Sequence, residues 1–418
     1  MTNTDVNSPK KVYRFLALSI LAITLIHTTL SLLDYAQVIN YPNAFIGIGK
    51  FYIPYGDMAQ LTFTASCPIP IQSLADGSQT CDPAGRPFNL MFPALLIFRA
   101  LSINQNSHTT SGLAVGTITI GILIYFATQL RAELPLTSQA FLSAGILASY
   151  PFQLALERGN TDLVIFASLI LFAISFDAFT AQKSAKQWLA SAFISSFSIL
   201  FKLWAGPGII LTLLFTSLRK MHAQKSFRIA RLSLALAVFL VALFVVSYLG
   251  SAHVFRNTEV WEGHVSFGVN ASYYPPSVAE PGLYKDPIRA WKLLLCVAGA
   301  WWAYRWPIAE NHISNRSGQC LSLLCLQLSF FTYASVYLLS TSWDYRLISL
   351  SLAVPYFLHQ LALKRKLSLI PIGLIAFVAY ELYIPVEWAW GIPETLSDFI
   401  AQPALIGILA VSVSRSSS

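Results

Sequence analysis

The segment LALERGNTDLVIF, residues 154–166, holds several polar side chains between two long apolar runs. Glu157, Arg158, Asn160 and Asp162 are the members that could do chemistry. A charge at the centre of a bilayer costs roughly 2.5–3.5 kcal/mol on insertion scales, so we do not expect these side chains to face lipid. Two interpretations remain open. The segment is a charged turn in which Asn160 caps the next helix, or it presents an arginine to an anionic group.

Asp57 is a second carboxylate that could react, in the sequence PYGDMAQ. The preceding Gly56 permits a sharp turn, and a carboxylate placed there could act as a general base or as a metal ligand. An aspartate before MAQL is also a good helix N-cap, so a purely structural role stays open. No His-x-x-x-His or Asp-x-Asp pattern occurs, and we therefore expect no metal and no cofactor.

A turn framed by prolines, CDPAGRPFN, brings three more polar residues together. Asp82, Arg86 and Asn89 follow one another in it, and Asp-Pro is a common way to begin a turn. One interpretation is a structural contact between Asp82 and Arg86. The other is that Arg86 and Asn89 hold a polar substrate above a short helix that begins at Leu90.

Four further polar residues occur at the ends of apolar runs or between them. Lys202 in FKLWAGPG is followed by helix-breaking residues, and it is either a lysine whose stem lies in the membrane interface or a phosphate ligand. Asp344 and Arg346 in SWDYRLISL are spaced as a helix cap with an ion pair, or as part of a site. His264 lies in a long loop between two apolar runs.

Long apolar runs must position these residues. Of the 418 residues, 55% are hydrophobic and 11% are charged, whereas about a quarter of the residues of a soluble protein are charged. The mean hydropathy is +0.59. Because about 20 apolar residues span a bilayer, we expect an all-α polytopic membrane protein with a bundle of about 12 transmembrane helices. The expected spans are 13–33, 110–130, 138–156, 161–180, 187–201, 203–218, 232–250, 288–304, 318–340, 347–363, 367–383 and 399–413.

One apolar run, 89–103, is shorter and contains a proline and Arg99. We expect an interfacial helix there and not a span. The first apolar run follows basic residues but precedes no small-x-small cleavage site, which favours an uncleaved first span. The chain then forms a single transmembrane domain, 1–418, with two long outer loops at 34–109 and 251–287.

The charges predict the orientation of the chain. With the N-terminus inside, most of the 27 Lys and Arg residues fall in inner loops, as the positive-inside rule requires. Of the 19 acidic residues, all but Asp5, Glu133, Asp177 and Glu310 fall outside. We therefore expect a multi-pass inner or plasma membrane protein with cytoplasmic termini and a site on the outer, periplasmic face. The net charge of +8 reflects this topology and attraction to anionic lipid, and indicates no nucleic-acid partner.

Two of the five cysteines, Cys67 and Cys81, share the first outer loop. A bridge between them would close a loop of about fifteen residues and stabilise it by about 3 kcal/mol in an oxidising compartment. The sequence leaves open whether this bridge forms. Cys296, Cys320 and Cys325 lie in or beside apolar runs and are expected to be packing residues.

The polar residues of the outer side suggest one chemistry when they are taken together. Cations at a membrane interface suit a lipid phosphate or pyrophosphate. Arg158, Lys202 and Arg346, with His264, would supply them. A carboxylate opposite these cations, Asp57, suits deprotonation of an incoming hydroxyl. The combination indicates sugar transfer from a polyprenyl-phosphate donor.

Five segments follow one another in order along the chain: GDMAQL, CDPAGRPFNLMFPALLIF, ERGNTDLVIFA, FKLWAGPGIILTL and WDYRLISLSL. In these segments the chain resembles the integral-membrane glycosyltransferases of the GT-C fold, in particular the polyprenyl-phosphate-mannose-dependent mannosyltransferase family. The resemblance implies that Asp57 is the catalytic base, that ERGNTD is the family's Gly-(Gln/Asn) turn, and that Lys202 begins a helix with a Lys-x-x-x-x-Pro pattern. NLMFP departs from the aromatic-Pro-Pro or Tyr-Pro sequence of the family.

The expected function is that of an inverting hexosyltransferase, which moves a mannose-like sugar from a polyprenyl-phosphate donor to a glycolipid or cell-envelope glycan acceptor in the bilayer. The expected donor-phosphate ligands are Arg158, Lys202, Arg346 and His264. The expected acceptor or sugar ligands are Asp82, Arg86, Asn89, Glu157, Asn160 and Asp344. The competing classes are a polysaccharide polymerase or ligase, a transporter of lipid-linked glycans, which would carry charges deep inside several spans, and a structural membrane protein.

Overall fold

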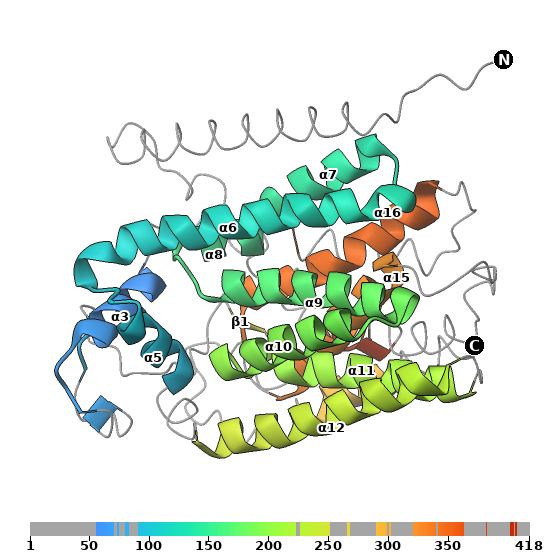
Figure 1. Cartoon of the computed structure of the whole chain (residues 1–418). Helices are drawn as coiled ribbons and strands as arrows, with labels where there is room; N and C mark the ends of the chain where they lie inside the picture. The colour runs from blue at the N-terminus through green and yellow to red at the C-terminus, as the bar shows by residue number, and fades with distance from the viewer. Residues whose placement is uncertain are drawn as a thin grey trace.

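The computed structural model is a bundle of helices, accompanied in its described part by one short β-ladder (Figure 1). The described residues are 56–70, 73–74, 80–82, 91–222, 226–250, 266–267, 290–298, 301, 321–339, 342–362, 382, 402–404 and 406–407. The α-helices are α3 (Gly56–Ser66), α5 (Phe92–Ala100), α6 (His108–Gln129), α7 (Leu136–Leu147), α8 (Tyr150–Glu157), α9 (Asp162–Gln182), α10 (Ala185–Phe201), α11 (Ala205–His222), α12 (Phe227–Gly250), α15 (Leu321–Leu339) and α16 (Val354–Ala362). The remaining elements are the 3-10 helices η1 (Gln105–Ser107), η2 (Leu130–Ala132) and η3 (Asp344–Ala353) and the antiparallel strands β1 (Ser266–Phe267) and β2 (Ser342–Trp343).

Three helices of the described part are long and apolar enough to cross a membrane. They are Gln105–Ala132, which joins η1, α6 and η2, Asp162–Gln182, which is α9, and Phe227–Gly250, which is α12. This finding confirms an all-helical architecture and indicates a membrane protein. The bundle of about 12 spans stays a prediction, because 13–33 and nearly all of 367–383 lie outside the described residues.

Helix α9 lies at the centre of the bundle. It packs against α6, α10 and α15, and 72% of its most apolar stretch is buried, against 33% for α12. Four phenylalanines of α9, Phe166, Phe172, Phe176 and Phe179, are buried. The Phe172 and Phe176 rings stack with centroids 5.5 Å apart, and Phe152 of α8 meets Phe166 edge-on at 6.5 Å. The first residues of α9 are therefore positioned by a well-packed helix.

The two ends of the bundle differ in charge. Lys183, Lys186, Arg219, Lys220 and Arg228 lie where α9 and α11 end and where α10 and α12 begin, so we call this the basic end. The opposite end carries α3, α5 and the first turns of α6, α9 and α11, and we call it the site end (Figure 1). Arg99, Arg158 and Lys202 lie at the site end, and the orientation of the bundle in the membrane stays a prediction.

Glu133 ties helices together at the basic end. Its Oε1 accepts a hydrogen bond from the N–H of Leu321 at 2.8 Å and its Oε2 accepts one from the N–H of Ser322 at 3.1 Å, at the start of α15. The Nδ1 of His359 in α16 bonds with the carbonyl oxygen of Glu133 at 2.8 Å. Glu133 therefore acts as a helix cap, since the first N–H groups of a helix have no acceptor within it.

Two expected spans differ in the structure. The run 138–156 is divided into α7 and α8, and Pro151 occupies the first turn of α8. Because proline lacks the N–H that a continuous helix would use there, the helix ends and begins again. The run 347–363 begins within the 3-10 helix η3 and becomes α16 at Val354, where Pro355 removes another N–H donor.

Candidate functional site

Asp57 and Arg158 lie in contact at the site end, although 101 residues separate them in the sequence. Arg158 Nε donates to Asp57 Oδ2 at 2.9 Å and Arg158 Nη2 donates to Asp57 Oδ1 at 2.6 Å, which makes a bidentate, charge-assisted pair. The side chains are 17% and 16% exposed, respectively. Both side chains of the pair therefore keep some access to solvent.

The backbone also joins the two residues. The N–H groups of Asp57 and Met58 both donate to the carbonyl oxygen of Arg158, at 3.0 and 3.4 Å. These N–H groups belong to the first turn of α3, where a helix offers no acceptor of its own. Asp57 lies inside α3, which begins at Gly56, so the interpretation of Asp57 as the N-cap is wrong. Its carboxylate is directed to Arg158 instead.

The turn after α8 brings Asn160 to the same carboxylate. Gly159 adopts a φ of 58°, the left-handed conformation that commonly ends a helix. Asn160 Nδ2 then donates to Asp57 Oδ2, and Asn160 Oδ1 accepts from the N–H of Asp162 at 2.8 Å. Asn160 therefore holds the turn before α9 and orients Asp57, while the N-cap position of α9 is Thr161. The interpretation of Asn160 as the cap, one of the two that the sequence left open, is wrong in this detail.

Lys202 and Trp204, in the connection between α10 and α11, extend this network. Lys202 Nζ lies 2.7 Å from Asp162 Oδ1 and donates to Asn160 Oδ1 at 3.2 Å. Trp204 Nε1 donates to the same oxygen of Asp162 at 2.7 Å. Asp162 is fully buried, and these donors offset the loss of hydration of its charge.

The two ion pairs of the network differ in their access to solvent. Arg158 faces Asp57 and Lys202 faces Asp162, so the four ionised groups add no net charge to the site. Lys202 is 13% exposed, and Asp162 has no exposed surface. Asp162 is therefore the one of these four side chains that has no access to solvent, and Lys202, which bonds to both Asp162 and Asn160, helps to hold Asn160 in place.

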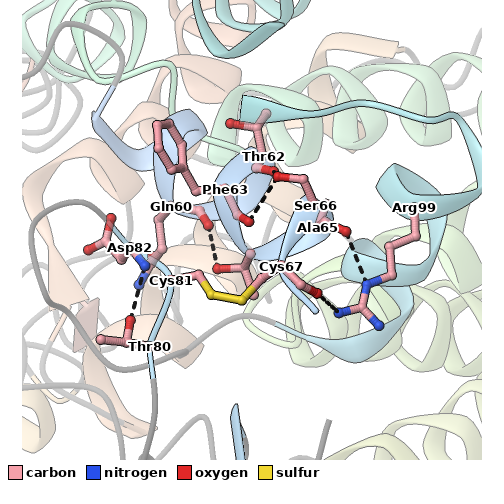
Figure 2. The surroundings of a disulfide bond; sticks show 11 residues. Gln60, Thr62, Phe63, Ala65, Ser66, Cys67, Thr80, Cys81, Asp82 and Arg99 are labelled. Carbon is pink, nitrogen blue, oxygen red and sulfur yellow. Dashed lines mark hydrogen bonds between the residues drawn. A yellow bond between two sulfur atoms is a disulfide. The ribbon is translucent and has the colours of Figure 1, made fainter. Parts of the chain in front are cut away.

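A disulfide joins Cys67 and Cys81 just beyond α3, with Cα atoms 6.2 Å apart (Figure 2). Arg99 of α5 contacts the same region from the other side. Its Nε donates to the carbonyl oxygen of Ala65 at 3.2 Å and its Nη2 donates to that of Cys67 at 3.3 Å (Figure 2). The nine residues of α5 are too few to span a membrane, as predicted for this run. The disulfide and Arg99 together fix the end of the helix that carries Asp57.

The structure describes some of the other residues that were predicted to bind the acceptor or the sugar. Glu157, the last residue of α8, is half-buried beside Arg158 in the chain. Asp82 is buried after Cys81, and its N–H donates to the hydroxyl of Thr80 at 3.1 Å. The predicted site residues that lie outside the described part of the chain are Arg86, Asn89 and His264.

The second outer loop meets the segment of Asp344 and Arg346 through the β-ladder. Ser266 pairs with Trp343, so the residues just after His264 lie beside the start of η3. Asp344 and Arg346 fall in η3, which packs against α8 and α9. Their side chains lie outside what the structure describes. Their backbone therefore belongs to an element that packs against α8, the helix that directly precedes Arg158.

Two residues of interest were not predicted from the sequence. Trp204 bonds to Asp162, and the available signal was its place two residues after Lys202 in FKLWAGPG. Lys292 is fully buried, with its Nζ 5.9 Å from the centroid of the Tyr337 ring, which is a cation–π arrangement. The sequence signal for Lys292 was its position inside the expected span 288–304, because charged residues within a span are rarely tolerated without a function.

No group of three or more His, Cys, Asp and Glu side chains in the described part of the chain could hold a metal ion. No protein family, characterised protein or solved structure matches the chain. Its function is therefore argued from the chemistry of Asp57, Arg158 and their neighbours.

Proposed function

We propose that the protein is a membrane glycosyltransferase that moves a mannose-like hexose from a polyprenyl-phosphate donor to a lipid-linked or cell-envelope glycan. The observation that carries the proposal is the Asp57–Arg158 pair, a carboxylate and a guanidinium in contact and partly exposed at one end of an apolar helical bundle. The carboxylate suits the acceptor hydroxyl, and the guanidinium suits the donor phosphate.

Asp57 takes the proton of the acceptor hydroxyl in the proposed reaction, while the hydroxyl oxygen attacks the anomeric carbon of the sugar. The new C–O bond forms on the face opposite the phosphate, so the configuration at this carbon inverts. The bond from the anomeric carbon to the phosphate oxygen breaks, and its electron pair gives the phosphate an additional negative charge. Arg158 stabilises that charge, and such electrostatic stabilisation is usually the largest single contribution to catalysis.

Lys202 has a positioning role in this proposal and not the phosphate-binding role that its sequence context suggested. Its ammonium is bonded to Asp162 and Asn160, so it holds the amide of Asn160 against Asp57. Arg346 and His264 remain proposed donor ligands. The packing of η3 on α8, and the ladder that joins the second outer loop to η3, support their approach to the site.

Two observations support an outer-face location for the site. Disulfides persist in oxidising compartments, and the Cys67–Cys81 bridge follows directly on the helix that carries Asp57. Basic residues gather at the opposite end of the bundle, as they do on the cytoplasmic side of membrane proteins. The proposal therefore includes a periplasmic site and cytoplasmic termini.

A transporter of lipid-linked glycans and a polysaccharide polymerase or ligase are the alternative functions. A transporter is expected to carry charged residues deep inside its spans. In α6, α9 and α12, by contrast, the Asp, Glu, Lys and Arg residues lie within two turns of a helix end. This distribution favours an enzyme that works at the membrane interface.

The direct test is transfer from a defined donor. Purified protein in lipid nanodiscs is given radiolabelled polyprenyl-phosphate mannose, with and without glycolipids extracted from cell envelopes. We expect polyprenyl phosphate to be released only when acceptor is present, and the label to appear in one glycolipid product. Growth of a long polymer would identify a polymerase. Movement of intact donor across proteoliposomes without transfer would overturn the proposal.

A further inference from the structure

We infer that the Asp57–Arg158 ion pair is a lock that the donor phosphate opens, so that the base becomes available only after a donor has bound. This inference rests on the proposed function and adds an order of events to it. In the structure, Arg158 donates to both oxygens of Asp57, and Asn160 donates to one of them. A carboxylate engaged in this way is poorly placed to take a proton from a substrate hydroxyl.

Arg158 is suited to exchange one anion for another. A guanidinium binds phosphate oxygens in the same bidentate manner in which it binds a carboxylate. Arg158 follows the last residue of α8 as its C-cap, next to the left-handed Gly159, and its side chain reaches solvent. Because the pair is largely buried, opening it costs free energy, and the incoming phosphate has to offset this cost through its own charge-assisted contact with Arg158.

Asp57 keeps its place when the guanidinium turns to a phosphate. Its N–H stays bonded to the carbonyl oxygen of Arg158, and Asn160 Nδ2 stays bonded to Oδ2. Asn160 is itself fixed by Lys202 and by the N–H of Asp162. Arg158 Nη2 contacts Oδ1 of Asp57 in the structure. We therefore assign Oδ1 as the oxygen that takes the proton of the acceptor hydroxyl.

The charges balance through the catalytic cycle. When the acceptor proton moves to Asp57, the neutral carboxylic acid no longer competes for the guanidinium. At the same moment the phosphate gains negative charge as its bond to the sugar breaks, so Arg158 is held most strongly by the product phosphate. Loss of the proton from Asp57 to water restores the carboxylate, which recaptures Arg158 and favours departure of the lipid phosphate.

The test is a double-mutant cycle on the affinity for a lipid phosphate, measured by calorimetry without acceptor. The probe is a short-chain polyprenyl phosphate in detergent micelles. It is titrated into the wild type, Asp57→Asn, Arg158→Gln and the double variant. Asparagine removes the competing charge and keeps the shape of the side chain. We expect Asp57→Asn to bind roughly two- to fivefold more tightly than the wild type, and Arg158→Gln to bind more weakly.

The decisive comparison is the effect of Asp57→Asn in the Arg158→Gln background. A lock predicts that the gain disappears there, because no guanidinium remains to be released. An equal gain in both backgrounds would reflect only the removal of a negative charge, and it would overturn the lock. If Asp57→Asn gave no gain in affinity in the wild-type background, the lock would be overturned as well. That result is expected if phosphate binds the edge of the guanidinium that does not contact Asp57.

Two further controls keep the outcome interpretable. If Arg158→Gln does not fold, Arg158→Lys replaces it, because lysine keeps the charge but loses the bidentate geometry. In that background the gain from Asp57→Asn is expected to shrink, and an undiminished gain would again overturn the lock. A wild-type protein that binds no lipid phosphate would instead contradict the proposed function itself.

Discussion

Lys202 and Asp162 form an ion pair inside the protein, in which the ammonium nitrogen lies 2.7 Å from Asp162 Oδ1 and the Asp162 side chain has no exposed surface. The same oxygen accepts the N–H of Trp204. The pair therefore attaches the start of α9 to the connection between α10 and α11. A buried charge that loses its partner costs about 3–5 kcal/mol. A large loss of stability on removal of the Lys202 ammonium would therefore indicate a structural role for Lys202.

Lys202→Met is expected to lower the free energy of unfolding by about 3–5 kcal/mol, because it leaves the buried Asp162 without its cation. Thermal and denaturant unfolding in detergent measure this change. The matched variant Lys202→Met/Asp162→Asn removes both charges and is expected to recover most of the lost stability. A single variant as stable as the wild type would contradict the buried pair. A stable double variant that no longer binds lipid phosphate would restore Lys202 as a donor ligand.

The disulfide is expected to be present in protein taken from cells and to stabilise the end of α3. Cys67 and Cys81 should react with maleimide only after reduction, as mass spectrometry of the labelled peptides would show. The variant Cys67→Ser/Cys81→Ser should lose about 3 kcal/mol of unfolding free energy, the value typical for a closed loop of this length. Cys325→Ser, which changes a cysteine of α15 that is not part of the disulfide, is the labelling control. Labelling of Cys67 without reductant would speak against both the bridge and the oxidising compartment.

Gly208 allows α11 and α15 to approach closely. A Cβ atom at this position would lie 2.6 Å from the Cα and 2.8 Å from the nitrogen of Thr332, and backbone atoms cannot give way without a shift of the helix. Gly208→Ala is therefore expected to destabilise the protein by about 1–3 kcal/mol, despite the better helix propensity of alanine. Gly121→Ala is the control, because a Cβ there meets no atom within 4 Å. Equal unfolding midpoints for the two variants would exclude this close approach.

Several features of the site follow from patterns over short stretches of sequence. The break at Gly159 and the turn held by Asn160 follow from a glycine and an asparagine placed between two apolar runs. The sequence left open whether Cys67 and Cys81 form a disulfide, although their place in one outer loop made the bridge possible. The bend at Pro151 was equally visible, but the length of the apolar run suggested a single span.

The contact between Asp57 and Arg158 could not be predicted in the same way. It depends on how α3 docks against the turn between α8 and α9, and no local pattern reports such packing. For the same reason the sequence left open an N-cap role for Asp57 beside the role of base. A cap needs only neighbouring residues, whereas the observed partner of Asp57 comes from the turn between distant helices.

We propose Asp57 as the base in sugar transfer from a polyprenyl-phosphate donor. Asp57→Asn removes the carboxylate and preserves its shape, and Asp177→Asn, which removes a carboxylate near the basic end of α9, is the matched control. The measurement is transfer of radiolabelled sugar to extracted acceptors by purified proteins with equal unfolding midpoints. We predict a fall of about 10²–10⁴-fold for Asp57→Asn, the usual contribution of a general base, and wild-type activity for Asp177→Asn. Transfer by Asp57→Asn at the wild-type rate would contradict the claim.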